Sequence, residues 1–364
     1  MRILKGDEMI KMMVNDSEKI ALVDKANMLD GLARFPAQIK ESLTIAEAAE
    51  RFSFLKIDNV VIAGMGASAI SGDIMASLFR DKLDVPLVVN REYDLPKWVN
   101  KDTLVICISY SGNTDETLSS FKIAYQKKCK IICISTGGKL QDLAEKRQVP
   151  FVKIPAGIQP RAATAYLLFP SIIFLKKIGL LKTTIEADIE ETIAVTQDFV
   201  TTNNKTVPEE NNQAKQIAKK IYNTIPQIYG WGIYTPIAIR WRHQLNENSK
   251  VIARNDIAPE CNHNDIVGWS QNPDISKQFS CIMIRDKDEE TIDMTTRLNF
   301  MRDLFHNTAG TVIEVFPKGK SQLAKMMYLM CLGDFTSCYL AVLRGIDPSP
   351  VDIITELKKR LAEK

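Results

Sequence analysis

The motif GMGASAISGD places Gly64 and Gly66 where a buried strand should turn into a helix. Such turns bring the backbone close to a phosphate at a helix N-terminus. With Ala69 the spacing fits a dinucleotide turn, but Asn90 and Arg91 stand where the ribose-binding acid belongs. No Gly-Lys-Ser/Thr follows, which excludes a P-loop. A dinucleotide turn, or glycines that serve only close packing, remain alternatives to a small phosphorylated metabolite.

A second motif, SYSGNTDET, ends the third predicted strand and precedes a helix. It gathers the hydroxyls of Ser109, Ser111 and Thr114 around a glycine and an asparagine. Hydroxyls and free backbone N–H groups at a helix N-terminus suit a compact dianion. The same residue types also cap helices, but this cluster supplies more than one cap needs. We therefore predict a phosphate site here.

Groups able to move protons gather later in the chain. The segment 244–269 carries Glu247, Glu260 and His263 within a short polar stretch. A carboxylate and an imidazole can act as general base and general acid. From the sequence alone, Glu247 could equally be an ordinary exposed glutamate on a helix, and His263 a loop histidine hydrogen bonded to the backbone.

Composition indicates a globular protein with a sizeable core. The 364 residues are 45% hydrophobic and 25% charged, and the formal net charge is only +3. The absence of a like-charge run argues against nucleic acid and polybasic membrane contacts as partners. No apolar run approaches the length of a membrane span, and acidic residues interrupt the apolar N-terminus, unlike a signal peptide.

Cysteine and histidine usage predicts a cytoplasmic protein without a metal centre. Seven cysteines lie mostly in apolar strand or helix contexts, which is typical of buried free thiols in a reducing compartment. The only histidines are His243, His263 and His306, and no Cys/His cluster is present. We therefore expect neither a zinc site nor another metal.

The first half of the chain alternates buried strands with amphipathic helices after a helical start at 17–52. Short apolar strands separated by helices predict a parallel sheet covered on both faces. The predicted strands lie at 59–66, 85–90, 103–112, 130–136 and 150–155.

The polar segment TTNNKTVPEENNQ is the best linker in the chain. Beyond it the alternation resumes, with strands at 227–232, 279–286 and 310–317 and helices at 235–253, 288–306, 320–345 and 350–363. We predict an α/β protein with two αβα sandwich domains. The predicted divisions are a helical extension 1–39, a first domain 40–200, a linker 201–213 and a second domain 214–364.

The pair GMGASAISGD and SYSGNTDET resembles the sugar isomerase (SIS) domain, whose Ser/Thr loop holds the phosphate of a phosphosugar. This resemblance implies that both predicted domains are SIS-type. It assigns phosphate contacts to Ser109, Ser111 and Thr114, and places Ala67 and Ser68 in the first glycine-rich turn.

Further motifs narrow the resemblance. GIQPRAATAYLLFP, the polar stretch at 244–269 and the lysine-bearing C-terminal helix are together similar to the bifunctional phosphoglucose/phosphomannose isomerase family over about 40–361. The resemblance implies a cofactor-free, metal-independent interconversion of glucose 6-phosphate, and of mannose 6-phosphate, with fructose 6-phosphate. A non-catalytic phosphosugar-binding protein, or an isomerase of another phosphosugar, is the alternative.

The resemblance also implies residue roles and a partner. Glu247 matches the base that shuttles a proton between C1 and C2, and Arg161 matches the cation near the enediolate. His263 matches a ring-opening group that the neighbouring subunit contributes, so a homodimer is implied. Glu260 remains the alternative base.

The last helix should supply a lysine as partner in ring opening. Ile354, Leu357 and Leu361 predict its inward stripe. Lys358 lies on the flank of this stripe and Lys359 roughly opposite. We predict Lys358, with Lys359 the alternative.

One position departs from the family pattern. The first turn reads Gly-Met-Gly-Ala-Ser, whereas the family usually has Gly-Met-Gly-Gly-Ser. Ala67 therefore adds a methyl group where the backbone passes close to the sugar.

Overall fold

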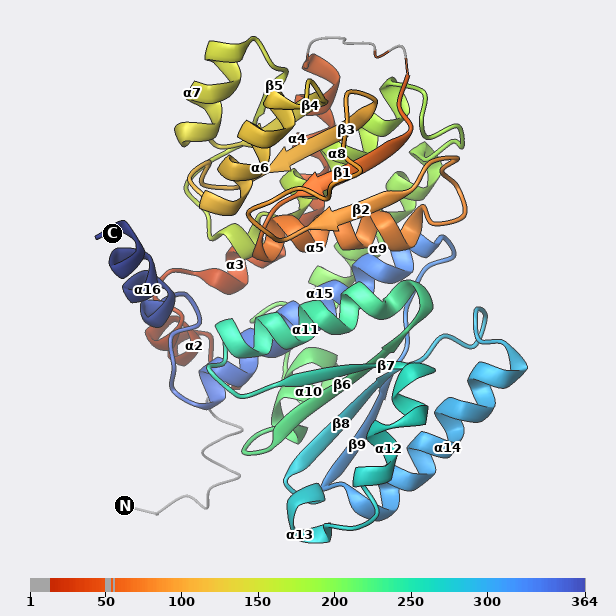
Figure 1. Cartoon of the computed structure of the whole chain (residues 1–364). Helices are drawn as coiled ribbons and strands as arrows, with labels where there is room; N and C mark the ends of the chain where they lie inside the picture. Colours follow the sequence, from red (N-terminus) through yellow and green to blue (C-terminus); the bar gives the residue numbers. More distant parts are fainter. Residues whose placement is uncertain (1–13, 50–53, 55, 364) are drawn as a thin grey trace. The chain divides into compact units, whose positions relative to one another are not determined.

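The computed structural model describes residues 14–49, 54 and 56–363. Its described residues form two compact units (Figure 1). The first-sheet unit comprises 34–194 with 319–324, and the second-sheet unit comprises the described part of 1–33 with 195–318 and 325–364. The chain passes between the units after residue 33, within α9 (Glu186–Asn203), and twice more at the two ends of segment 319–324.

The first-sheet unit is built on five parallel strands in the order β2-β1-β3-β4-β5. Central β3 is buried at every position, as its unbroken apolar sequence predicts. The strands are β1 (Asn59–Ala63), β2 (Leu87–Asn90), β3 (Thr103–Ile108), β4 (Lys130–Ser135) and β5 (Phe151–Lys153).

Helices cover both faces of this sheet (Figure 1). On one face α6 (Asp115–Gln126) and α7 (Gly138–Arg147) bury a core against alternate strand residues such as Val105 and Cys107. The other face carries α5 (Gly66–Leu78), where Gly72 approaches Ile62 so closely that a Cβ would lie 3.0 Å from its Cγ2. Behind α5 pack α8 (Thr164–Lys177) and α4 (Phe35–Ala48).

The second-sheet unit repeats this arrangement with four parallel strands in the order β7-β6-β8-β9. The prediction of two parallel sheets flanked by helices is confirmed. One strand, β7, was not predicted, because its residues follow the predicted helix 235–253 and were taken as part of the polar stretch 244–269. The strands are β6 (Ile225–Trp231), β7 (Arg254–Ala258), β8 (Phe279–Ile284) and β9 (Thr311–Val315).

Neighbouring residues of β6 show which helices cover its two faces. Tyr229 stacks on Phe305 of α14 (Ile292–Thr308), with ring centroids 4.9 Å apart. Gly230 faces α11 (Thr235–Glu247), where a Cβ would lie 2.7 Å from that of Ala238. Because successive strand residues point to opposite faces, α11 and α14 lie on opposite sides of the sheet.

Helix α15 (Gln322–Leu343) forms the core behind α11. Gly333 lets the Trp241 ring approach, and the indole Nε1 donates to the Leu329 carbonyl at 2.8 Å. By length and hydropathy α15 alone among the described helices could cross a membrane, but its most apolar window is entirely buried in the protein. It is therefore the core helix of this unit.

The predicted helix at 17–52 is three helices, α2 (Ser17–Val23), α3 (Met28–Ala33) and α4. Asp24 ends α2 and accepts from the N–H groups of Met28 and Leu29, which starts α3. Residues 50–52 lie outside the described residues. The remaining helices are α10 (Gln213–Lys220), α12 (Asp265–Gly268), α13 (Pro273–Ser276) and α16 (Asp352–Ala362).

Candidate functional site

The hydroxyls in the loop from β3 to α6 do not act as a simple helix cap. Ser109 is only 2% exposed, and its hydroxyl pairs with that of Thr114 at 2.9 Å and accepts from the Gly112 N–H at 3.1 Å. Thr114 is the N-cap residue of α6, yet its side chain makes no capping hydrogen bond. Ser111 is exposed. We call residues 109–114 the serine loop.

Glycines lock the serine loop against the turn after β4. Gly112 has φ +68°, and a Cβ built on it would lie 1.7 Å from the Gly137 carbonyl oxygen. The Leu140 N–H donates to the Gly112 carbonyl at 2.9 Å, and the Lys139 N–H donates to the Asn113 side chain at 3.1 Å. The loop is therefore held before any ligand arrives, which lowers the entropic cost of binding.

The turn after β1 meets the serine loop at the same sheet edge. A Cβ on Gly64 would lie 2.9 Å from the Ile108 carbonyl oxygen, at the end of β3. Gly66 adopts φ +52° and begins α5, in which Ala67 is half-buried and Ser68 buried. This packing brings the two predicted phosphate motifs together.

The end of β2 does not resemble a ribose site. Asn90 donates to the Glu92 carbonyl at 2.9 Å and to the Ser120 hydroxyl at 3.2 Å. Arg91 is hydrogen bonded and ion-paired to Asp73 of α5. An amide and a paired cation thus occupy the place of the ribose-binding acid, which weighs against a dinucleotide.

Arg161 lies in a short 3-10 turn (Pro160–Ala162) and is only 5% exposed. Its Nη1 donates to the Gln159 side chain at 3.4 Å. The preceding backbone is tied to the serine loop, because the Ile158 N–H donates to the Tyr110 hydroxyl at 3.1 Å. Burial raises the pKa of Tyr110, so this hydroxyl stays neutral. The first-sheet unit therefore joins Arg161 to the phosphate motifs.

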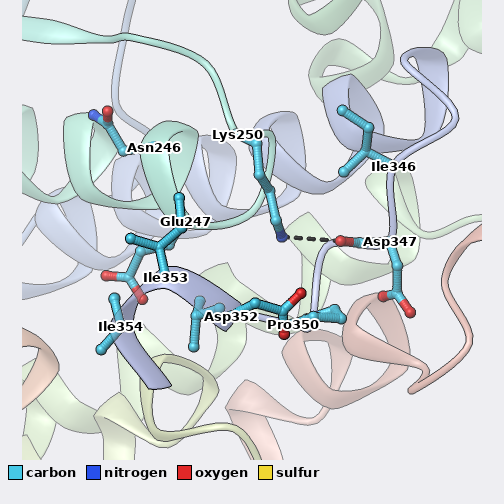
Figure 2. A pocket seen from close by; sticks show the side chains of 10 residues that line it. Asn246, Glu247, Lys250, Ile346, Asp347, Pro350, Asp352, Ile353 and Ile354 are labelled. Carbon is cyan, nitrogen blue, oxygen red and sulfur yellow. Dashed lines mark hydrogen bonds between the residues drawn. The ribbon is translucent and has the colours of Figure 1, made fainter. Parts of the chain in front are cut away.

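In the second-sheet unit, Glu247 is the last residue of α11 and is half-buried. It lines a cavity of about 520 Å³, a size that accommodates a small metabolite. Figure 2 shows its side chain beside Ile353 and Ile354 of α16. The lining residues are Asn246, Glu247, Lys250, Ile346, Asp347, Pro350, Val351, Asp352, Ile353 and Ile354.

Buried polar contacts fix α11 on α15. The Arg240 guanidinium binds both carboxylate oxygens of Asp334, at 2.9 and 2.7 Å, and Gln244 donates to the same carboxylate at 3.0 Å. Both partners of this ion pair are almost fully buried. A helix held in this way presents its last residue, Glu247, in a defined position.

His263 ends a 3-10 turn (Glu260–His263) after β7 and is exposed. Two anchors flank it: Cys261 is buried, and Asp265 accepts from the Tyr229 hydroxyl at 2.6 Å and from Trp269 Nε1 at 3.0 Å. His263 is not among the residues lining the Glu247 cavity.

Glu260, the alternative base, is exposed and does not line the cavity either. Its carboxylate accepts from the Asn264 amide at 2.9 Å. Of the two candidate carboxylates, Glu247 lines this cavity and Glu260 does not.

The predicted inward stripe of α16 is wrong for the single chain. Ile354, Leu357 and Leu361 are 41%, 56% and 44% exposed, because little of the chain packs on this helix. Lys358 and Lys359 are both exposed and neither lines the cavity. The structure therefore does not distinguish the two lysines.

Two residues near the site were not predicted from the sequence. Lys250 lines the cavity and Asp265 anchors the His263 turn. Lys250 lay inside the polar stretch singled out at 244–269, but its partners are backbone carbonyls, which leave no pattern in the sequence. Within the described residues no group of three or more His, Cys, Asp or Glu could hold a metal ion.

Comparison with protein families matches both units. Residues 53–157 match the SIS domain, and residues 210–361 match the bacterial phospho-glucose isomerase C-terminal SIS domain.

Two curated relatives carry the name bifunctional phosphoglucose/phosphomannose isomerase. That of Caldicellulosiruptor bescii is 40% identical over 338 residues, covering 92% of this chain and 99% of the relative. That of Aquifex aeolicus is 34% identical and covers 83% of this chain and 90% of the relative.

Among solved structures, the C-terminal domain of glucosamine-fructose-6-phosphate aminotransferase from Francisella tularensis superposes with a TM-score of 0.67. The match covers 89% of this chain and 98% of that one, at 17% identity. At this identity the likeness establishes the fold alone.

Proposed function

Because the chain belongs to the bifunctional phosphoglucose/phosphomannose isomerase family, we propose that it interconverts glucose 6-phosphate and mannose 6-phosphate with fructose 6-phosphate. The observation that carries this proposal is the 40% identity to a named isomerase over almost its whole length. The preformed serine loop adds a physical reason for a phosphorylated substrate.

The serine loop binds the sugar phosphate in this proposal. Hydroxyls of Ser109, Ser111 and Thr114, with backbone N–H groups at the start of α6, donate to the phosphate oxygens. Ala67 and Ser68 contact the substrate from the adjoining turn.

Isomerisation begins with ring opening. His263 and Lys358 move protons so that the C1–O5 bond breaks, O5 gains a proton and the C1 hydroxyl becomes a carbonyl. Glu247 then removes the C2 proton and returns it to C1, while Arg161 stabilises the enediolate. In the same step the hydroxyl proton on O2 passes to O1, so that C2 becomes the carbonyl and C1 the hydroxymethyl carbon. Glucose 6-phosphate and mannose 6-phosphate differ in configuration only at C2. They therefore give the same enediol, and one base serves both. The net reaction moves protons only, so the proposal includes no cofactor and no metal.

We assign the working enzyme as a cytoplasmic homodimer in which His263 serves the partner's site. Its support is the exposure of His263 on an anchored turn outside the cavity that Glu247 lines. A group so placed suits a site completed by a second copy of the chain.

The first experiment is a coupled assay for fructose 6-phosphate with each aldose separately, in the presence of a chelator. The matched variants are Glu247→Gln and Glu260→Gln, which remove one carboxylate each and keep its size. We expect wild type and Glu260→Gln to turn over both sugars, and Glu247→Gln to lose at least about 10³-fold in kcat.

Other outcomes would refute parts of the proposal. Activity that survives in Glu247→Gln and collapses in Glu260→Gln would move the base to Glu260. Phosphosugar binding without turnover in the wild type would indicate a sensor or an isomerase of another phosphosugar.

A mixing experiment tests the shared site. Glu247→Gln and His263→Ala are each inactive in the proposal, but a mixed dimer contains one intact site. Random mixing should restore about a quarter of wild-type activity, since half of the dimers are mixed and each has one of two sites intact. No restoration, or a monomeric mass in solution, would refute the shared site.

A further inference from the structure

We propose that Lys250 is a positioning residue that holds the start of α16 beside the end of α11, an inference that rests on the proposed isomerase function. Lys250 follows Glu247 by three residues, has φ +52° and lines the same cavity. No role follows for it from the sequence motifs.

The Lys250 ammonium gathers carbonyls from two separate segments. It donates to Asp347 and Pro348, both at 2.9 Å, and to Asn248 at 3.2 Å (Figure 2 shows the bond to Asp347). An ammonium has three protons, and these three carbonyls offer an acceptor for each. We call this set of bonds the lysine clasp.

The near side of the clasp is rigid. Asn248 and Ser249 are fully buried, and they bond to the Ser337 hydroxyl at 2.8 Å and the Ser337 carbonyl at 2.6 Å in α15. The turn that carries Lys250 is thereby fastened to the core helix.

On the far side, Pro348 and Ser349 are buried, and α16 begins three residues after Ser349. Every residue of α16 from 352 to 361 is exposed, so its own packing does not fix the helix. Its first residues, Asp352, Ile353 and Ile354, nevertheless form part of the cavity wall around Glu247. The clasp therefore fastens the segment that leads into α16, and through α16 it contributes to the position of Lys358.

This placement predicts a specific kinetic defect. If α16 carries the ring-opening lysine, loosening its start should impair ring opening more than proton transfer between C1 and C2. Interconversion of the α and β anomers of glucose 6-phosphate reports ring opening alone, because C1–O5 breaks and re-forms without loss of the C2 proton. Exchange NMR measures this rate, and the coupled assay measures isomerisation.

The test compares Lys250→Met, Lys250→Arg and Lys127→Met with wild type. Lys127 is the matched control, since it donates to the carbonyls of Val99 at 2.9 Å and Lys97 at 3.4 Å in the first-sheet unit. For Lys250→Met we expect at least a tenfold loss of catalysed anomer interconversion with unchanged KM. Lys250→Arg, which keeps a charged donor, should recover much of it, and Lys127→Met should match wild type.

Hydrogen–deuterium exchange gives a readout that does not depend on activity. Peptides covering 346–363 should exchange at least about tenfold faster in Lys250→Met, with the rest of the chain unchanged. If the wild type proves not to be an isomerase, this measurement still tests the clasp. The inference is overturned if α16 exchanges as in wild type, or if Lys250→Met loses isomerisation with anomer interconversion intact.

Discussion

The close contact between Gly112 and the Gly137 carbonyl gives the sharpest test of whether the serine loop binds the substrate phosphate. In Gly112→Ala the new Cβ would start 1.7 Å from the Gly137 carbonyl oxygen, whereas ordinary contact begins at 3.4 Å. The serine loop must therefore shift by roughly 1.7 Å, the difference of these two distances. A shift of this size breaks hydrogen bonds to a bound phosphate.

The expected loss follows from the bonds affected. A hydrogen bond to a charged group contributes about 1.5–3 kcal/mol. Losing two of them costs about 3–6 kcal/mol, or about 10² to 10⁴-fold in affinity. Isothermal titration with fructose 6-phosphate measures this directly.

Gly179→Ala is the matched control. Gly179 also has a positive φ, +77°, but a Cβ there would meet nothing within 4 Å. Both variants pay the backbone strain of about 1–2 kcal/mol for a left-handed residue, but only Gly112→Ala displaces the loop. We expect the control to bind fructose 6-phosphate like wild type and to be slightly less stable.

A milder variant tests the serine loop even if Gly112→Ala does not fold. Asn113→Ala removes the acceptor of the Lys139 N–H without adding an atom, and should lower affinity by about tenfold. If folded Gly112→Ala binds fructose 6-phosphate within threefold of wild type, the serine loop does not hold the phosphate.

Three further outcomes follow from buried groups of the second-sheet unit. Asp334→Ala removes the carboxylate that pairs with the buried Arg240 guanidinium, and should cost about 3–5 kcal/mol of unfolding free energy in urea titrations. The double variant Arg240→Met/Asp334→Leu should stay near wild type, and equal losses would contradict this. Asp265→Ala removes the acceptor of Tyr229 and Trp269, and should lower kcat about tenfold with unchanged phosphate affinity, because the serine loop lies in the other unit. Burial lowers the pKa of Lys215 to about 8. Between pH 8 and 10 the unfolded chain therefore binds more protons than the folded protein, so the free energy of unfolding should rise with pH in wild type relative to Lys215→Met. Parallel pH profiles of the two proteins would refute this.

Apolar strands and hydroxyl-rich turns were predictable because local pattern determines them. Strand β3 reads TLVICI, buried throughout, and the loop after it gathers its hydroxyls within six residues. Strand β7 escaped because it begins Arg254-Asn255-Asp256 and lies at the sheet edge, paired only with β6. An edge strand keeps one side open to water and tolerates polar residues there.

Contacts between distant segments were beyond the sequence. Lys250 meets carbonyls 97 and 98 residues away, and Asp265 meets a tyrosine 36 residues away. Neither contact follows from periodicity. On α16 the periodicity was misleading instead: Ile354 and Leu357 have the spacing of a buried helix face, yet both are exposed.

The two sheets explain why the proposed roles divide between the units. Gly232 directly after β6 has φ +48°, and Gly66 three residues after β1 has φ +52°, so a left-handed glycine follows the first strand of each sheet. The loops that follow differ, because hydroxyls follow β3 whereas Asp286 and Glu290 follow β8.

These carboxylates are engaged from within the unit: Glu290 binds Arg285 at 2.7 Å and Asp286 binds Lys325 at 3.0 Å. Carboxylates at the loop would repel a dianion, and the cations that could attract one are already paired. In our proposal, phosphate binding therefore falls to the first-sheet unit. The second-sheet unit carries the proposed proton-transfer group, Glu247, at the end of a helix that the buried Arg240–Asp334 ion pair holds in place.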